Sequence, residues 1–269
     1  MGLIDQAGRA AATTHYVMPP QDLAPLVAEA WIQRYTDAIR TEPRTWRVVA
    51  DHQAHLIVHR PLGKAPRGAR VVGARSTWLD VPVARRAWSA GVTLRPGVLP
   101  LLTGLPASDF TDGSASPEDV WGRQGAELRD AIGETGTAAA VIGVLVAFIR
   151  MRAAGSLPAI DWRVRSVSTR AAASTAPAVA GLAAHLGVST RTLRNIYGRE
   201  VGISPREALS IGRLHGVVGR ALAGSYRNGW SRLALASGFY DQAHLIRDFH
   251  RFLGETPESF LARGAPMAV

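Results

Sequence analysis

The C-terminal part of this sequence contains an internal repeat, which constrains the fold more than any other feature. One copy runs LAAHLGVSTRTLRNIYGREVGISP, Leu182 to Pro205, and the other runs LALASGFYDQAHLIRDFHRFLGETP, Leu233 to Pro257. Each copy predicts a short helix, a turn at a glycine and a second helix. The closing Gly-x-(Ser or Thr)-Pro fits the start of a further helix, with a hydroxyl N-cap and proline in the first turn. The recurring positions lie 52 residues apart: Leu193, Tyr197, Val201, Gly202 and Pro205 recur as Leu245, Phe249, Leu253, Gly254 and Pro257.

This spacing matches a helix-turn-helix unit. Gly187 and Gly238 lie where the first helix of each copy should end, and glycine accepts the left-handed conformation that such a turn requires. Ser189 and Asp241 precede the second helix and are suited to cap it. The residues expected to fill the angle between the two helices are Val188 and Phe239.

The second helix of each copy has one apolar and one polar face. A solvated polar face on a helical hairpin is common, so one copy alone would be ambiguous, but two copies in register favour a shared function. Arg, Asn and Gln are suited to bidentate hydrogen bonds with guanine and adenine edges. The expected core positions are Leu193, Ile196 and Tyr197 in the first copy and Leu245, Phe249 and Phe252 in the second.

The last 100 or so residues resemble the DNA-binding domain of the AraC/XylS family of transcription regulators, most clearly in GFYDQAHLIRDFHRFLGETPESFL, Gly238 to Leu261. The resemblance implies two helix-turn-helix units joined by one long helix, here about Pro205 to Ala223. It also implies that two recognition helices enter adjacent major-groove segments of duplex DNA. By this resemblance, the base-contacting positions are Arg191, Arg194 and Asn195, and Gln242, His244 and Arg247, with Thr190 and Asp241 beside them.

The connecting segment departs from the family pattern because it is rich in glycine. Each glycine inside a helix costs about 1 kcal/mol relative to alanine. The relative orientation of the two units is therefore open at this point. The glycines are Gly212, Gly216, Gly219 and Gly224.

The first part of the chain has a different texture, with Pro or Gly every few residues between short runs rich in Val, Leu and Trp, which predicts a β-rich domain. We expect helices at Leu23–Trp31, at Pro117–Ile132 with Ser116 as its cap, and at Thr137–Ala154. The runs Gly91–Asp112 and Asp119–Gly122 resemble the amino-terminal domain of one AraC subfamily. That resemblance implies a barrel-like sensory or dimerisation domain. Its tryptophans could line a ligand pocket or pack in the core.

Together these patterns predict an α+β protein. A β-rich, barrel-like N-terminal domain with flanking helices occupies residues 1–154, a linker with room for a short helix occupies 155–177, and an all-α DNA-binding domain occupies 178–269. The two helix-turn-helix motifs are expected at about 180–203 and 231–255. The pentapeptide QAHLI occurs in both domains, at Gln53–Ile57 and Gln242–Ile246. Its surroundings predict a strand at the first position and a helix at the second.

The charge supports a polyanionic partner. The chain has 31 basic and 21 acidic residues, a formal net charge of +10, and a pI near 11.1. Only Lys64 is lysine, so a GC-rich genome is an alternative source of part of the arginine content. The last 100 residues nevertheless carry +6, against +4 for the first 169, which favours a DNA surface in the C-terminal domain.

Other features set limits. The chain has no cysteine, which excludes thiol nucleophiles and thiolate metal sites. We interpret His52, His55 and His59 beside Asp51 as ordinary polar side chains, because their spacing matches no helical zinc pair, and we expect no metal and no cofactor. No paired-carboxylate, GxSxG or phosphate-loop motif predicts an enzyme.

The N-terminus lacks the pattern of a secretory signal, and the apolar run Ala138–Ile149 is too short to cross a bilayer. We therefore expect a cytoplasmic, bacterial regulator that binds double-stranded DNA without a membrane partner. Other expected partners are a small-molecule effector in the N-terminal domain, a second copy of the chain through the Thr137–Ala154 helix, and RNA polymerase if the protein is an activator. Two alternatives stay open: an enzyme fused to a DNA-binding module, and a non-specific nucleoid-type DNA binder.

Overall fold

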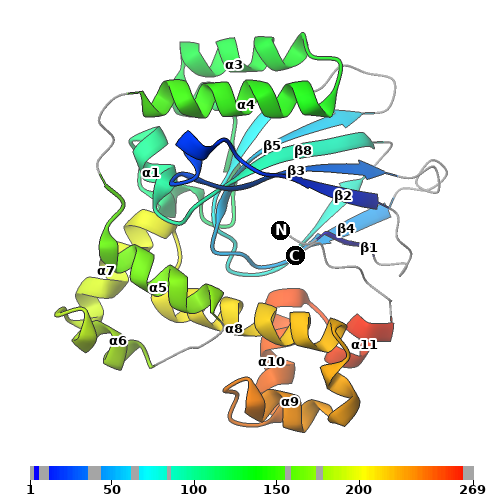
Figure 1. Cartoon of the computed structure of the whole chain (residues 1–269), viewed down its shortest axis with the longest axis vertical. Coiled ribbons are helices and arrows are strands. Elements are labelled where there is room, and N and C mark those ends of the chain that lie inside the picture. The colour runs from blue at the N-terminus through cyan, green and yellow to red at the C-terminus, as the bar shows by residue number, and fades with distance from the viewer. Residues whose placement is uncertain are drawn as a thin grey trace.

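The computed structural model describes residues 3–5, 12–35, 44–61, 67–83, 86–154, 159–173 and 178–262 (Figure 1). Its N-terminal part is β-rich and its C-terminal part is helical. In Figure 1 the strands and helices α3 and α4 form one half of the molecule, and helices α6 to α11 lie below them. The predicted fold class is confirmed.

The strands form two antiparallel sheets. The larger sheet has the order β2-β3-β8-β5-β6-β9 and the smaller has the order β1-β4-β7. Among the described strands neither sheet closes on itself, so the domain is barrel-like only in a loose sense. The strands are β1 Leu3–Asp5, β2 Ala12–Val17, β3 Val27–Tyr35, β4 Arg44–Val48, β5 Ala54–Pro61, β6 Arg67–Val72, β7 Leu79–Val83, β8 Arg86–Leu94 and β9 Ser114–Ala115.

Alternation along the central strand β8 explains how the larger sheet is covered. Ala90 and Val92 are fully buried in the cluster that includes α4, Ala138–Ala153. The intervening Ser89 and Thr93 lie on the opposite face. Helix α4 buries Leu145 and begins at the N-cap Thr137, whose side chain accepts a hydrogen bond from the Ala140 amide. The helix predicted at Thr137–Ala154 is confirmed, and its apolar side covers one face of the larger sheet.

The helix predicted at Leu23–Trp31 is wrong. Gln21–Leu23 forms a single 3₁₀ turn, and strand β3 begins at Val27 and pairs with β2 on one side and β8 on the other. The spacing of the apolar residues in this segment is compatible with one face of a helix and also with a buried strand. Pairing with two neighbouring strands decides between them, because a strand in this position completes the hydrogen bonds of both neighbours.

The helix predicted at Pro117–Ile132 is two helices, α2 Pro117–Trp121 and α3 Arg123–Gly133. They meet at Gly122, which has φ 55° and ψ −124°, a conformation that glycine accepts readily. The predicted cap is confirmed, because the Ser116 side chain accepts a hydrogen bond from the Asp119 amide, and the Asp119 carboxylate accepts one from the Ser116 amide.

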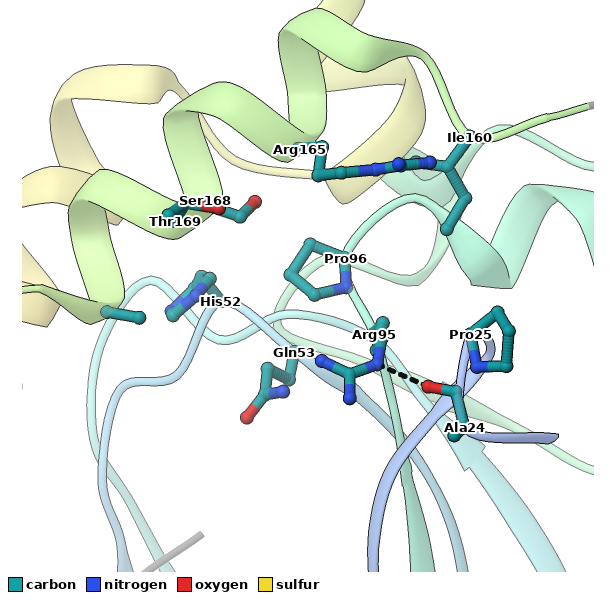
Figure 2. A pocket seen from close by; sticks show the side chains of 11 residues that line it. Ala24, Pro25, His52, Gln53, Arg95, Pro96, Ile160, Arg165, Ser168 and Thr169 are labelled. Carbon is teal, nitrogen blue, oxygen red and sulfur yellow. Dashed lines mark hydrogen bonds between the residues drawn. The ribbon is translucent and has the colours of Figure 1, made fainter. Parts of the chain in front are cut away.

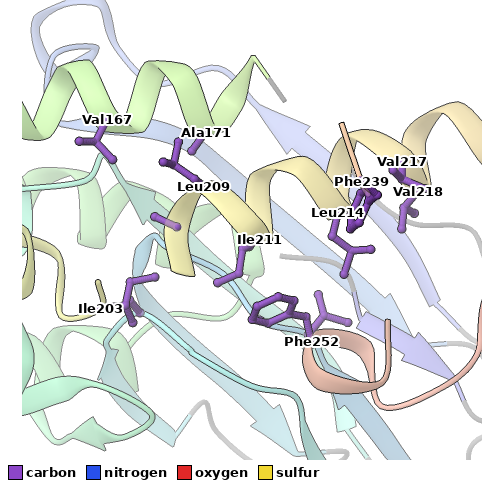
Figure 3. Packing of buried hydrophobic residues seen from close by; sticks show 14 of the residues in the cluster. Val167, Ala171, Ile203, Leu209, Ile211, Leu214, Val217, Val218, Phe239 and Phe252 are labelled. Carbon is purple, nitrogen blue, oxygen red and sulfur yellow. The ribbon is translucent and has the colours of Figure 1, made fainter. Parts of the chain in front are cut away.

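The helices from α5 onward build the C-terminal part. Their common core includes Val167 and Ala171 of α5 and the apolar face of α8 (Figure 3). Val49, Ala50 and Ala74 of the β-rich domain belong to the same core, so the two parts pack together. These helices are α5 Trp162–Ala172, α6 Val179–His185, α7 Thr190–Val201, α8 Pro205–Leu222, η4 Ser225–Asn228, α9 Trp230–Ala236, α10 Gln242–Leu253 and α11 Pro257–Ala262. Two short helices that precede them, α1 Val98–Thr103 and η3 Ala107–Phe110, belong to the core of the β-rich domain.

Helix α5 lies within the segment 155–177, in which we expected a linker with room for a short helix. A Cβ built on Gly212 of α8 would lie 2.1 Å from the carbonyl oxygen of Ala171 in α5. One glycine of the connecting helix is therefore explained, because it allows α5 to approach the backbone of α8. The division into domains at residues 154 and 178 stays a prediction.

Candidate nucleic-acid interface

Helices α6 and α7 form the first helix-turn-helix unit. Gly187 in the turn has φ 66°, and Ser189 caps α7 by accepting a hydrogen bond from the Thr192 amide at 3.0 Å. Leu193 and Tyr197 are fully buried, as the repeat predicts. The Tyr197 hydroxyl lies 3.1 Å from Ser168 Oγ, which connects α7 to α5. The buried face of α7 and its contact with α5 therefore fix the orientation of this helix.

The opposite face of α7 is open to solvent. The four candidate DNA contacts of this unit, Thr190, Arg191, Arg194 and Asn195, are all exposed. The guanidinium groups of Arg191 and Arg194 have no side-chain partner among the described residues. Two guanidinium groups and one side-chain amide on this face can therefore contact a ligand without first losing a contact within the protein.

Helices α9 and α10 form the second unit in the same way. Gly238 has φ 75°, and the Asp241 carboxylate accepts a hydrogen bond from the His244 amide at 2.6 Å. Leu245 and Phe249 are fully buried, and the Phe249 ring contacts the Trp230 ring edge-on at a centroid distance of 5.8 Å. The Asp241 carboxylate is thus occupied as an N-cap, which leaves it less available to DNA.

The other candidate DNA contacts on α10 differ in whether their side chains already contact other residues of the protein. Arg247 is exposed and has no side-chain partner among the described residues. Gln242 Oε1 accepts a hydrogen bond from Ser231 Oγ at 2.5 Å. The His244 ring contacts the Phe239 ring at a centroid distance of 5.2 Å, and its Nε2 lies 3.9 Å from a carboxylate oxygen of Asp248. Arg247 is the side chain of this face that needs no rearrangement to contact a ligand.

The turn of the second unit is held by Arg213 of α8. Its Nη1 donates to the carbonyl oxygen of Gly238 at 3.1 Å, and its guanidinium stacks over the Phe239 ring at 4.3 Å. Asp248 lies 3.6 Å from the same guanidinium, and burial raises the pKa of this carboxyl above its usual range. The connecting helix therefore contacts the turn of the second unit through the partly buried guanidinium of Arg213.

Sequence reasoning missed one exposed aromatic residue in this region. Tyr240, in the turn that precedes α10, is 86% exposed. It stands between Phe239, which enters the core, and Asp241, which caps the helix. The position of Tyr240 in the sequence could have predicted its exposure. A residue between a core residue and a helix cap lies in the turn, where its side chain points to solvent.

The β-rich domain contacts both units at equivalent positions of the repeat. Gly202 and Gly254 end the two second helices, with φ 98° and 73°. Thr111 Oγ1 donates to the Gly202 carbonyl at 2.6 Å, and Arg47 Nη1 donates to the Gly254 carbonyl at 3.0 Å. A Cβ on Gly254 would lie 2.6 Å from the Trp78 ring. The sequence showed the glycines but not these partners.

A buried histidine adds a further contact between the two parts. His215 Nε2 of α8 lies 3.1 Å from the carbonyl oxygen of Ala50, whose amide donates to the Phe252 carbonyl at 3.1 Å. Burial lowers the pKa of His215 to about 4. The folded protein therefore holds this imidazole neutral, and protonation opposes the packed arrangement.

We expect the protein to lose stability as pH falls from about 6.5, the ordinary histidine pKa, toward the folded value. The unfolded chain binds the proton first, so the stabilising effect is complete above the unfolded pKa. Urea unfolding of His215→Gln, compared with the parent between about pH 7 and about pH 5, should show a weaker loss on acidification. His52 faces the same region and its pKa is also lowered by burial, so part of the loss remains. Equal losses in both proteins would contradict the assignment.

The histidine cluster of the β-rich domain is hydrogen-bonded internally. His55 is buried, with Nε2 3.2 Å from an Asp51 carboxylate oxygen and Nδ1 3.2 Å from Thr93 Oγ1. His59 Nδ1 lies 2.7 Å from Ser89 Oγ. In the part of the chain that the structure describes, no group of three or more potential ligands is placed to hold a metal ion. No helix of that part has the length and apolar character that a membrane span requires.

Comparison with known proteins identifies two regions. Residues 15–116 match a family model described as a domain of unknown function, DUF6597, and residues 182–263 match one described as a helix-turn-helix domain. No curated protein sequence matches this chain.

Solved structures with a similar arrangement include ToxT from Vibrio cholerae O395, at 9% identity and TM-score 0.44, covering 95% of this chain and 98% of that one. The P21 crystal form of ToxT from Vibrio cholerae has 8% identity and TM-score 0.41, covering 98% and 99%. The chain carries an AraC-type helix-turn-helix domain at residues 182–263, which follows a β-rich N-terminal domain.

Proposed function

We propose that this protein is a transcription regulator that binds a specific DNA site by inserting α7 and α10 into adjacent segments of the major groove. The observation that carries the proposal is the pair of exposed polar faces at equivalent positions of two helix-turn-helix units. Both faces stay uncovered although the β-rich domain contacts the C-terminal ends of both helices. A non-specific binder needs cations for phosphates but no such paired faces.

We assign base contacts to the exposed or partly exposed side chains with the chemistry to read base edges. Arg191, Arg194 and Arg247 are suited to guanine, and Asn195 and Gln242 to adenine. Gln242 would have to exchange its contact with Ser231 for one with DNA. Thr190, His244 and Asp241 lie beside these positions, with Asp241 acting first as the cap of α10.

In vitro selection of duplex DNA by the full-length protein, followed by sequencing, tests the proposal. We expect a site with two short conserved blocks about one helical turn apart. Binding that is sensitive to salt but yields no consensus would overturn sequence-specific recognition and favour a nucleoid-type role. A single conserved block would overturn the paired insertion of α7 and α10.

Arg247→Ala is expected to weaken binding to the selected site by about 1 to 3 kcal/mol and to spare random DNA of equal length. The reason is that Arg247 is exposed and unpaired among the described residues, so its loss removes a base contact without disturbing the fold. Fluorescence anisotropy at matched salt measures both affinities. Arg123→Ala is the control, because Arg123 lies on α3 with its side chain 91% exposed. Equal losses on both DNAs would refute the role of Arg247 as a base reader.

We further propose that the β-rich domain regulates DNA binding in response to a small molecule. Its contacts with the carbonyl oxygens of Gly202 and Gly254 support this role, because a shift of the β-rich domain acts on both recognition helices. A homodimer formed through α4, and contact with RNA polymerase in the case of activation, complete the proposal. Light scattering of the full-length protein tests the dimer.

A further inference from the structure

A cavity of about 540 Å³ lies between the β-rich domain and helix α5 (Figure 2). One side is formed by the residues before β3 and β5 and after β8, and the other by α5 and the residue shortly before it. Pro25, Pro96 and Ile160 give it apolar surface. Cavities that bind small molecules measure about 300 to 1,000 Å³ and combine apolar walls with a few polar groups. Size and lining therefore match such a site.

Two exposed arginines line this cavity, one on each side. Arg95 lies on the strand side, where its Nε donates to the Ala24 carbonyl at 2.7 Å and its two terminal nitrogens have no partner among the described residues. Arg165 lies on α5, and its side chain has no partner in the described part of the chain. The described residues that line the cavity include no aspartate or glutamate. Two guanidinium groups without a lining carboxylate favour an anion, which arginine binds in bidentate geometry.

We propose that this cavity binds a small organic anion with an apolar body. The anionic group is held between Arg95 and Arg165, and the body packs against Pro25, Pro96 and Ile160. The side-chain amide of Gln53, which also lines the cavity and has no partner among the described residues, is available for a further polar contact. Binding itself does not depend on the proposed DNA function, whereas an effect of the ligand on DNA binding rests on it.

The position of the cavity connects it to the recognition helices. Ile160 packs against the core of the β-rich domain and also against the helical core. On the strand side, Gln53 lies three residues after Ala50, whose backbone is hydrogen-bonded to Phe252 of α10 and to His215 of α8. A ligand that touches both sides of the cavity therefore contacts the segments that hold α8 and α10 in place.

The test uses two fluorescent probes of nearly equal shape. 8-Anilinonaphthalene-1-sulfonate is an aromatic anion, and N-phenyl-1-naphthylamine has the same ring systems without the sulfonate. We expect the full-length protein to bind the anion at one site, and Arg165→Gln to weaken this binding about tenfold or more. The neutral probe should be affected less than about twofold, because it makes no charged contact. Arg123→Gln, on the exposed surface of α3, is the matched control for a general loss of positive charge.

Two further variants keep the test decisive. Thr169 of α5 is exposed and lines the cavity, so Thr169→Trp should place an indole ring in the space that the probes need and weaken binding of both probes without unfolding the chain. Arg95→Lys retains a charge but not the bidentate geometry, and should weaken binding of the anion only. Anion binding unchanged by Arg165→Gln or by Thr169→Trp would overturn the site, as would failure of the parent protein to bind the anion.

A second readout separates this site from the proposed function. The affinity of the full-length protein for its selected DNA is measured with and without a saturating concentration of the anionic probe. A change that disappears in Thr169→Trp supports a ligand site that communicates with α10. Variant-sensitive probe binding in a protein that selects no DNA sequence would leave the site standing and overturn the proposed function alone.

Discussion

Phe249→Ala is expected to lower the free energy of unfolding by about 3 to 5 kcal/mol. Phe249 is fully buried on α10, and its ring contacts those of Trp230 in α9 and Phe260 in α11 at centroid distances of 5.8 and 6.0 Å. Alanine would leave a cavity where three helices of the second unit meet. Since these helices are short, they depend on this packing rather than on their own helix propensity.

Urea unfolding followed by circular dichroism measures this loss, and DNA binding measures its consequence. We expect the variant to lose specific binding more than non-specific binding, because α10 would no longer be held in one orientation. Tyr240→Ala is the matched control, an aromatic residue of the same unit that is 86% exposed. Its free energy of unfolding should change by less than about 0.5 kcal/mol. A similar loss in both variants would mean that burial of Phe249 is not what stabilises the unit.

Gly212→Ala and Gly219→Ala are expected to have opposite effects, although both lie in α8. Alanine favours a helix by about 1 kcal/mol over glycine at either position. At Gly212 the new Cβ would lie 2.1 Å from the carbonyl oxygen of Ala171, which is backbone and cannot rotate away. Helix α5 must then move, and overpacking of this kind costs about 1 to 3 kcal/mol. At Gly219 nothing lies within 4 Å of the new Cβ, so the gain is kept.

The pair is its own control, because the substitution, the helix and the change in propensity are the same. The free energy of unfolding should fall for Gly212→Ala and rise for Gly219→Ala. Probe binding in the cavity beside α5 should weaken only in Gly212→Ala, because that variant displaces the helix that forms one wall. Stabilisation by both substitutions would show that α5 moves without cost and that its contact with α8 does not fix the interface.

Much of the helical domain could be predicted from local sequence. The glycine turns at Gly187 and Gly238 and the caps Ser189 and Asp241 are confirmed. These features depend on interactions within a few residues of the chain, which a sequence pattern records directly. The repeat predicted the core positions of the two units, because apolar residues that recur at equivalent positions are expected to be buried. The roles of the exposed side chains on DNA stay predictions.

The β-rich domain was predicted less well for the same physical reason. Val27–Tyr35 is a strand because β2 and β8 pair with it. A loop separates β2 from this strand, and β8 lies more than 50 residues later in the chain. Its apolar positions alone do not distinguish a helix from a strand. The contacts that join the domains were likewise invisible, since Arg47 and the Gly254 carbonyl lie 207 residues apart in the chain.

The pentapeptide QAHLI, which occurs once in each domain, shows that the surroundings of a short sequence decide its secondary structure. In the first copy, Ala54–Ile57 belongs to β5, where Leu56 packs into the core under α4 and His55 points to the other face. In the second copy, all five residues lie in α10, where Asp241 caps the helix and Leu245 is buried. Local sequence was enough to predict the turns, caps and repeat that build the two helix-turn-helix units. The strand pairing, the approach of α5 to Gly212 and the cavity beside α5 could not be predicted in this way, because they depend on groups that are distant in the chain and meet only when it folds.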